Sequence, residues 1–149
     1  MVDIDLLKKL RNETQAGIAD CRKALEASNN NYKKAIDWIR KEGLEKAAKK
    51  EGKETSQGLV ESYIHQNGRI GSLVEVLCET DFVARTDEFK NLVHEISMQV
   101  GAMNPKDVSA LLKQEYIRDS SKTIDSLIKE TIAKLGENII IKEFKRFAI

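Results

Sequence analysis

GLVESYIHQNGRIGSLVEVLCE, residues 58–79, is the stretch that decides the fold. Apolar and polar residues alternate on both sides of Asn67-Gly68, and this period of two is typical of a half-buried strand. Asn-Gly is the preferred pair for a tight type I′ turn, because both residues tolerate positive φ angles. The stretch predicts two antiparallel strands joined by a short hairpin, with three residues of the second strand on one face: Val74, Val76 and Cys78.

From Thr86 onward the period becomes helical. Apolar residues form one stripe along this predicted helix, which is the pattern of a helix packed against a core. Asn104-Pro105 ends the pattern, because the residue before a proline avoids the helical region. The stripe consists of Phe89, Leu92, Val93, Ile96, Val100 and Met103.

The remaining C-terminal residues predict three further elements. Residues 107–116 allow one or two helical turns, and residues 120–123 can cap a helix that runs through Leu135. Residues 137–149 are rich in β-branched and aromatic residues, which predicts a third strand. The expected fold class is α+β, with an antiparallel three-stranded sheet and helices packed on one face. So small a sheet leaves apolar strand surface uncovered, and we expect a homodimer through the sheet.

The first 43 residues predict a bundle of three short helices. Asp3 or Asp5 can cap the first helix, and its apolar residues share one face: Leu6, Leu7 and Leu10. The second helix is expected over residues 18–27. The third is expected from a cap at Asn31 to Gly43, since glycine is common just past a helix end.

Residues 44–56, LEKAAKKEGKETS, are charged and contain few large apolar side chains, so they predict a partly helical linker. The expected domains are therefore residues 1–43, a linker over 44–56, and a core over 57–149. The basic run at residues 46–53 could also contact RNA, as in an RNA- or ribosome-associated adaptor. It lacks the interleaved aromatics that stack on bases, which favours a solvated linker.

Composition sets broad limits on function. A third of the residues are charged, yet the net charge is +1, unlike the strongly basic balance of a dedicated nucleic-acid binder. The start of the chain lacks the layout of a signal peptide, and no apolar run is long enough to span a bilayer. We expect a cytoplasmic protein with reduced thiols, no membrane or direct nucleic-acid partner, and no metal or cofactor.

Enzymatic chemistry finds little support in the sequence. His65 and His94 have no evident partner for acid–base catalysis. Cys21 falls on the apolar face of the second helix and Cys78 at a strand end, where small buried hydrophobes are common. A thiol nucleophile would need a neighbouring base, and none is visible.

Asp81-Phe82 places a large ring in a charged turn. One interpretation folds Phe82 inward. The other presents the ring to a partner, as aromatic binding anchors are presented. Periodicity leaves both open. Ile18, near the first interhelical loop, allows the same two interpretations: it either packs in the core or contacts a partner.

Three segments resemble the elongation factor Ts family, in the order in which that family carries them. ETQAGIADCRKALEASNNNYKKAIDWIRKEG, residues 13–43, resembles its N-terminal domain. Residues 58–92 resemble the start of its core domain, and AKLGENIIIKEFKRF, residues 133–147, resembles the core's last helix and strand. The resemblance implies a ubiquitin-associated-like three-helix domain followed by an α+β dimerisation domain.

The resemblance also implies a function and two contact regions. Members of the family bind elongation factor Tu, a GTPase that delivers aminoacyl-tRNA, and promote GDP release. In the family an Asp-Phe pair after the second strand enters a gap beside the partner's nucleotide and Mg²⁺ site; here the matching positions are Asp81 and Phe82, in a turn shaped by Thr80, Val83, Ala84 and Arg85. The second implied contact lies at Gly17, Ile18, Ala19 and Asp20.

This chain departs from the family at two places. The family usually has larger, flexible residues where this chain has Ile18-Ala19. Longer members also have a helical insertion, and often a second core half, between the stretches resembling Asn104-Pro105 and Tyr116-Ile117. The short connection here resembles the members in which two chains pair to form the full core, which implies a homodimer.

Overall fold

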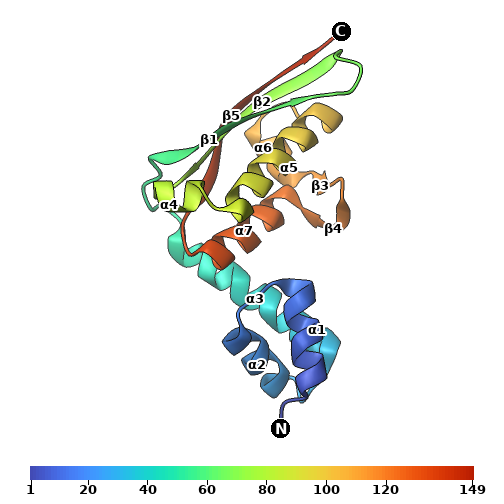
Figure 1. Cartoon of the computed structure of the whole chain (residues 1–149), viewed down its shortest axis with the longest axis vertical. Coiled ribbons are helices and arrows are strands. Elements are labelled where there is room, and N and C mark those ends of the chain that lie inside the picture. Colours follow the sequence, from blue (N-terminus) through green and yellow to red (C-terminus); the bar gives the residue numbers. More distant parts are fainter.

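The predicted hairpin forms two strands of a three-stranded sheet in the computed structural model, which describes all 149 residues (Figure 1). β1 (Gln57–Ile64) pairs antiparallel with β2 (Ile70–Cys78), and β2 pairs antiparallel with β5 (Ile139–Ala148). The strand order is therefore β1-β2-β5, with β2 in the centre. The α+β class and the antiparallel three-stranded sheet are confirmed.

The connection between β1 and β2 is wider than expected, and the type I′ prediction is wrong. The strands end at Ile64 and begin again at Ile70, and Gly68 alone of the Asn67-Gly68 pair has a positive φ, of 70°. Gly68 N donates to His65 O at 2.8 Å, which closes a four-residue turn. The Asn67 side chain accepts from Arg69 N at 3.0 Å and so stabilises this longer loop.

Helices cover one face of the sheet, as predicted (Figure 1). α5 (Asp87–Met103) begins at its cap Thr86, and Phe89, in its first turn, is fully buried. The five apolar residues of its stripe join one core with three residues of β2: Phe89, Leu92, Val93, Ile96 and Val100 with Val74, Val76 and Cys78. Met103, predicted to belong to the stripe, is half exposed at the last turn of the helix.

The short segment after α5 folds into α6 (Val108–Lys113) and a ribbon of β3 (Glu115–Tyr116) with β4 (Asp119–Thr123). The helical turns were predicted, but the ribbon was not. A buried Gln99 side chain holds the ribbon: its Nε2 donates to Glu115 O at 3.0 Å, and its Oε1 accepts from Ile117 N at 3.0 Å. α7 (Ile124–Leu135) follows, with Thr123, in the predicted cap region, as its N-cap and Gly136 as its C-cap.

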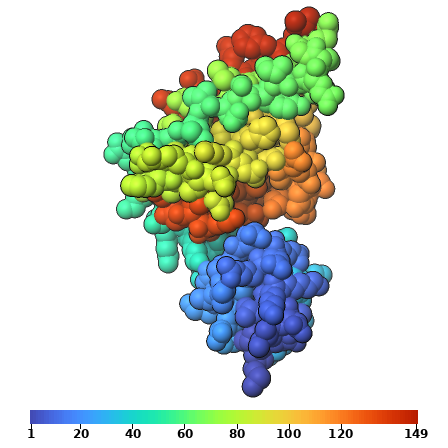
Figure 2. All heavy atoms as spheres, viewed as in Figure 1, coloured from blue at the N-terminus to red at the C-terminus, as the bar shows by residue number.

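Three helices form the N-terminal bundle: α1 (Ile4–Thr14), α2 (Ile18–Ala27) and α3 (Tyr32–Lys50). Asp3 caps α1 and Asn31 caps α3, as expected. Five buried residues form a small core of their own: Leu10, Cys21, Ala24, Leu25 and Ala35. Figure 2 shows the bundle as a separate lobe at one end of the molecule.

α3 does not end at Gly43, which corrects the expected helix end. The helix continues to Lys50 because its second half packs against α7 of the core. A Cβ added at Gly43 would lie 3.8 Å from the Ala133 Cβ, and Ala47 belongs to the main core. One continuous helix therefore joins the two lobes, and only residues 51–56 connect it to β1.

The opposite face of the sheet carries no helix and is rich in apolar side chains. The exposed large hydrophobics on it are Val60, Ile64, Leu73, Ile140 and Phe147. Leu73 lies on the central strand, opposite Ser62 of β1 and Lys145 of β5. None of the helices combines the length and apolar character needed to cross a bilayer.

Candidate partner-binding site

The Asp81–Phe82 turn, residues 80–85, follows the end of β2 directly. Asp81 and Phe82 begin α4 (Asp81–Ala84), a helix of one turn whose cap is Thr80. Thr80 Oγ1 accepts from Val83 N at 3.3 Å, and Arg85 N donates to Asp81 O at 3.2 Å. The Phe82 side chain projects from this turn and is 77% exposed. The outward interpretation of Phe82 therefore holds for its orientation.

Arg85 links the two residues at the tip of the turn. Its Nη2 donates to Asp81 Oδ2 at 2.6 Å, and its guanidinium carbon lies 5.7 Å from the centre of the Phe82 ring. A cation over an aromatic ring is a favourable contact, though modest at an exposed site. Asp81, Phe82 and Arg85 therefore form the exposed part of the turn.

The other predicted turn residues lie beneath this surface. Ala84 is buried in the main core, and Val83 packs partly against it. Thr80 is half-buried at the base of the turn. Of the residues predicted to contact a partner, Ala84 is placed to support the turn from below, because its side chain faces the interior.

Glu137 and Glu79, which the sequence did not single out, hold the base of the turn. Glu137 Oε1 accepts from Glu79 N at 3.1 Å and from Thr80 N at 3.0 Å, and its Oε2 accepts from Thr80 Oγ1 at 2.6 Å. Glu79 Oε2 in turn accepts from Asn138 N at 2.6 Å. These partners lie nearly sixty positions apart in the chain, so no local pattern could have indicated them.

The second predicted contact region lies at the start of α2. Gly17 caps the helix, Ile18 is 49% exposed and Ala19 is exposed. Ile18 is therefore only partly in contact with its own bundle. Asp20 has an intramolecular partner, Lys46 of α3, at 2.5 Å. This ion pair fixes the first turn of α2 against the helix that joins the two lobes.

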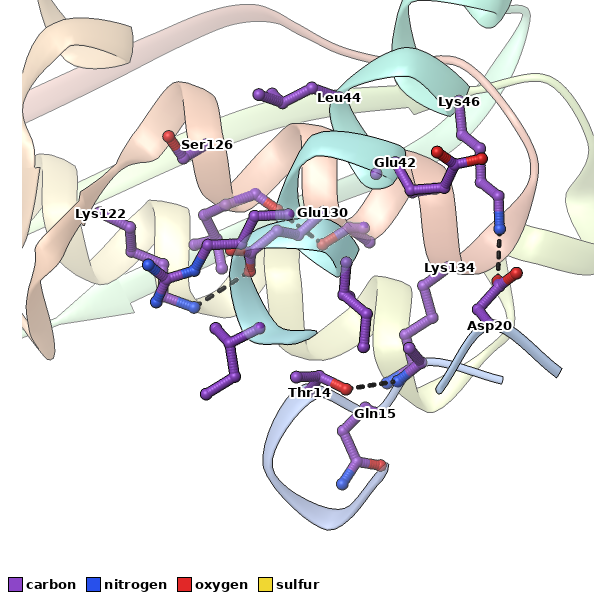
Figure 3. Close-up of a pocket in the computed structure, with 18 of the residues that line it drawn as sticks. Thr14, Gln15, Asp20, Glu42, Leu44, Lys46, Lys122, Ser126, Glu130 and Lys134 are labelled. Atoms are coloured by element: carbon purple, nitrogen blue, oxygen red, sulfur yellow. Dashed lines mark hydrogen bonds and ion pairs between the residues drawn. The ribbon is translucent and has the colours of Figure 1, made fainter. Parts of the chain in front are cut away.

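A groove of about 870 Å³ lies between the bundle and the core, and Gly17 and Asp20 are among the residues that line it. Figure 3 shows the Asp20–Lys46 pair at one side of the groove and Lys122 with Glu130 at the other. Both signs of charge occur along the groove and several are already paired. Its electrostatics therefore indicate neither an anionic nor a cationic ligand.

The two cysteines are buried and unpaired with each other. Burial, followed by the negative charge of Glu137, raises the pKa of the Cys78 thiol to about 11. Burial also raises the pKa of Cys21. A nucleophilic cysteine needs a lowered pKa, so neither thiol is activated. Of the two histidines, His65 contacts Tyr63, whose hydroxyl lies 3.0 Å from its Nδ1.

The fold is thus that of a two-lobed α+β protein, in which a helical lobe is joined to a core lobe that carries an exposed aromatic turn. The family model for elongation factor TS matches residues 79–149, which begin at the base of that turn. Proteins called elongation factor Ts are 45% identical in Thermoanaerobacter sp. (strain X514), 44% in Caldanaerobacter subterraneus subsp. tengcongensis and 38% in Desulfosudis oleivorans. Each alignment covers 99% of this chain, and 94%, 96% and 98% of those relatives respectively. The chain belongs to the elongation factor Ts family of translation elongation factors.

The alignments also show that this chain is shorter than those relatives. The Thermoanaerobacter alignment runs over 192 positions, which exceeds the 149 residues of this chain by 43. The relative therefore carries at least 43 residues without a counterpart here. We expected such a gap in the segment between α5 and α7, where α6 and the β3–β4 ribbon now make the connection.

Proposed function

We propose that this protein is a guanine nucleotide exchange factor that binds elongation factor Tu and promotes GDP release through the Asp81–Phe82 turn. The observation that carries the proposal is the Phe82 ring, 77% exposed on a turn that the rest of the chain holds in place. The unfavourable free energy of exposing a large apolar ring to water is removed only when a partner covers the ring. In this proposal the partner is the surface beside the nucleotide and Mg²⁺ site of elongation factor Tu.

The mechanism is one of differential affinity, because the factor makes and breaks no covalent bond. It must bind the nucleotide-free partner more tightly than the GDP-bound partner. By thermodynamic linkage, it then weakens GDP binding by the same factor. The Asp81–Phe82 turn supplies this difference in affinity, because the ring and the carboxylate fit the partner only when the partner's nucleotide site has shifted from its GDP-bound arrangement.

The free energy of burying one ring limits how much Phe82 can contribute to faster GDP release. Accelerating GDP release about a thousandfold requires a barrier lower by roughly 4 kcal/mol. Burial of one phenylalanine side chain contributes about 1.5–3 kcal/mol. Phe82 therefore supplies a large share, and the remainder comes from Asp81, Arg85 and a second contact at residues 17–20 on the bundle. α2 and α4 lie on the same side of the molecule in Figure 1, which is compatible with one partner touching both.

A homodimer through the open face of the sheet completes the proposal. This face exposes Val60, Ile64 and Leu73 without a covering helix. Exposed apolar patches of this kind are common at protein interfaces. A second copy would cover the face by the same residues, as a two-fold interface requires.

Release of labelled GDP from elongation factor Tu tests the proposal. We expect the wild-type protein, added at micromolar concentration, to accelerate release by about a thousandfold, which corresponds to a barrier lower by roughly 4 kcal/mol. Protein denatured by heat and an equal concentration of an unrelated protein serve as controls. Release at the spontaneous rate would contradict the exchange function, and binding without faster release would leave an adaptor.

A further inference from the structure

Three hydrogen bonds to one carboxylate hold the two residues that precede Asp81. β2 ends at Cys78, so the Glu79 and Thr80 amides have no partner in the sheet. Both donate to Glu137 Oε1, at 3.1 and 3.0 Å, and Thr80 Oγ1 donates to Glu137 Oε2 at 2.6 Å. Bonds to an ionised acceptor are stronger than bonds between neutral groups. Glu137 therefore fixes the backbone at the point where the chain leaves the sheet.

The Glu137 bonds belong to a reciprocal pair. Glu79 Oε2 accepts from Asn138 N at 2.6 Å, so each of the two segments offers a carboxylate to the backbone of the other. The Asn138 side chain extends the connection by donating to Lys53 O at 3.0 Å. Gly136, with a φ of 74°, turns the chain after α7 and places Glu137 at this corner.

The orientation of Phe82 depends on this corner because α4 has little stability of its own. In a helix of one turn, the few backbone hydrogen bonds do not offset the unfavourable free energy of helix nucleation. Thr80 connects the turn to the corner: its hydroxyl donates to Glu137 and accepts from Val83 N at 3.3 Å. The exposed Phe82 ring lies 5.7 Å from the Arg85 guanidinium carbon, on the same short turn. Thr80 thus transmits the position of Glu137 to α4.

We propose that Glu137 is the positioning residue of the Asp81–Phe82 turn, holding it ordered before a partner arrives. The inference rests on the proposed exchange function, because it gives Glu137 a role only through Phe82. A pre-ordered turn avoids the entropy cost of ordering it on binding. Loss of Glu137 then slows exchange without removing any group that touches the partner.

A double-mutant cycle tests the inference with the full-length protein. The variants are Glu137→Ala, Phe82→Ala and the two combined, and the measurement is the rate of GDP release from elongation factor Tu. Glu130→Ala is the matched control, since it removes a glutamate seven positions earlier, on α7, whose carboxylate is paired with Lys122 at 3.0 Å. Glu137→Gln keeps the side-chain length and one acceptor oxygen, and it serves in place of alanine if that variant does not fold.

We expect Glu137→Ala to slow release about tenfold, Glu137→Gln to restore part of the loss, and Glu130→Ala to have no effect. In the Phe82→Ala background, Glu137→Ala should cost little more, because both changes disable the same turn. Hydrogen exchange of the free protein should show faster exchange over residues 79–85 in Glu137→Ala, with the β1–β2 pairing unchanged.

Two results would overturn the inference and leave the exchange function intact. One is that the losses of Glu137→Ala and Phe82→Ala multiply fully, which would mean that Glu137 acts independently of the ring. The other is that residues 79–85 exchange at the wild-type rate in Glu137→Ala. If Phe82→Ala alone left release unchanged, the wedge in the proposed function would fail first, and the role of Glu137 with it.

Discussion

Phe82 is an exposed residue on a turn whose neighbouring side chains bond to one another. Its ring lies within reach of the Arg85 guanidinium, which also binds the Asp81 carboxylate. These contacts restrict the side chain on its outer side, while Thr80 fixes the backbone beneath it. The apolar surface of the ring stays exposed to solvent, so it is free to contact the proposed partner.

Cys78 makes the free energy of unfolding depend on pH in the alkaline range. The pKa of this thiol is about 11 in the folded protein, raised by burial and then by Glu137, against an ordinary value of 9.0. The unfolded state therefore loses the thiol proton first, and the free energy of unfolding falls as pH rises from about 9 to about 11. Below that window both states keep the proton, and the thiol has no effect.

Urea unfolding from about pH 8 to about pH 11 measures this dependence. The wild-type protein should lose more stability over this range than Cys78→Ala, which lacks the titrating group. Far-ultraviolet circular dichroism of Cys78→Ala at pH 8 verifies its fold. An identical pH slope for both proteins would show that Cys78 does not titrate as described.

At the scale of elements, the sequence predicted those helix starts and strands that local residue patterns determine. The expected caps at Asp3 or Asp5 and at Asn31, and the change of period at Thr86, marked helix starts correctly. Alternation marked β1 and β2, and β-branched and aromatic content marked β5. The errors came from tertiary contacts. Packing against α7 carries α3 past Gly43, a residue whose local signal is a helix end.

In the candidate site too, the sequence indicated the residues that form a local pattern and missed those placed by tertiary contacts. The Asp81–Phe82 turn could be found from sequence because a large ring in a polar turn is a local anomaly. Glu137 could not be found, because its role comes from bonds to Glu79 and Thr80. These residues lie 58 and 57 positions earlier in the chain. The β3–β4 ribbon was missed for a similar reason, since a buried Gln99 on another element holds it.

Gly43 provides a test of the continuous helix. An added Cβ would lie in ordinary van der Waals contact, 3.8 Å from Ala133 Cβ, so alanine fits there. Gly43→Ala should stabilise the protein by about 1 kcal/mol, because alanine favours a helix interior. The measurement is thermal unfolding, in which we expect a Tm higher by about 2–4 °C.

Gly101 in α5 is the matched control for Gly43. It is also a helical glycine, but an added Cβ would lie 2.9 Å from Tyr63 Cδ2, so the same substitution must displace the ring. Gly101→Ala should therefore stabilise less or destabilise. A lower Tm for Gly43→Ala would argue that α3 is interrupted at that position.

At the scale of the whole molecule, two lobes share one helix and the sheet has one open face. α3 runs from the bundle into the core, so one helix links the two proposed contact regions, residues 17–20 and the Asp81–Phe82 turn (Figures 1 and 2). The core leaves the apolar side of β2 around Leu73 without cover. The proposed second copy would bury this face and bring two exposed turns into one assembly.

Leu73→Lys tests the proposed dimer. A lysine ammonium buried in an apolar interface is costly, whereas on an open face it is tolerated. Light scattering at micromolar concentration should give a dimer for the wild-type protein and a monomer for Leu73→Lys. Ile4→Lys, an equally polar change of an exposed residue on α1, should remain dimeric. A wild-type monomer, or a dimeric Leu73→Lys, would contradict the interface.

GDP release from elongation factor Tu with Phe82→Ala tests the central claim most directly. Met103→Ala is the control, since it also truncates an exposed apolar side chain, at the opposite end of α5 and about 25 Å from the turn. We predict that Phe82→Ala keeps the fold and slows factor-stimulated release about ten- to a hundredfold, while Met103→Ala leaves it unchanged. Release at the wild-type rate with Phe82→Ala would contradict the account.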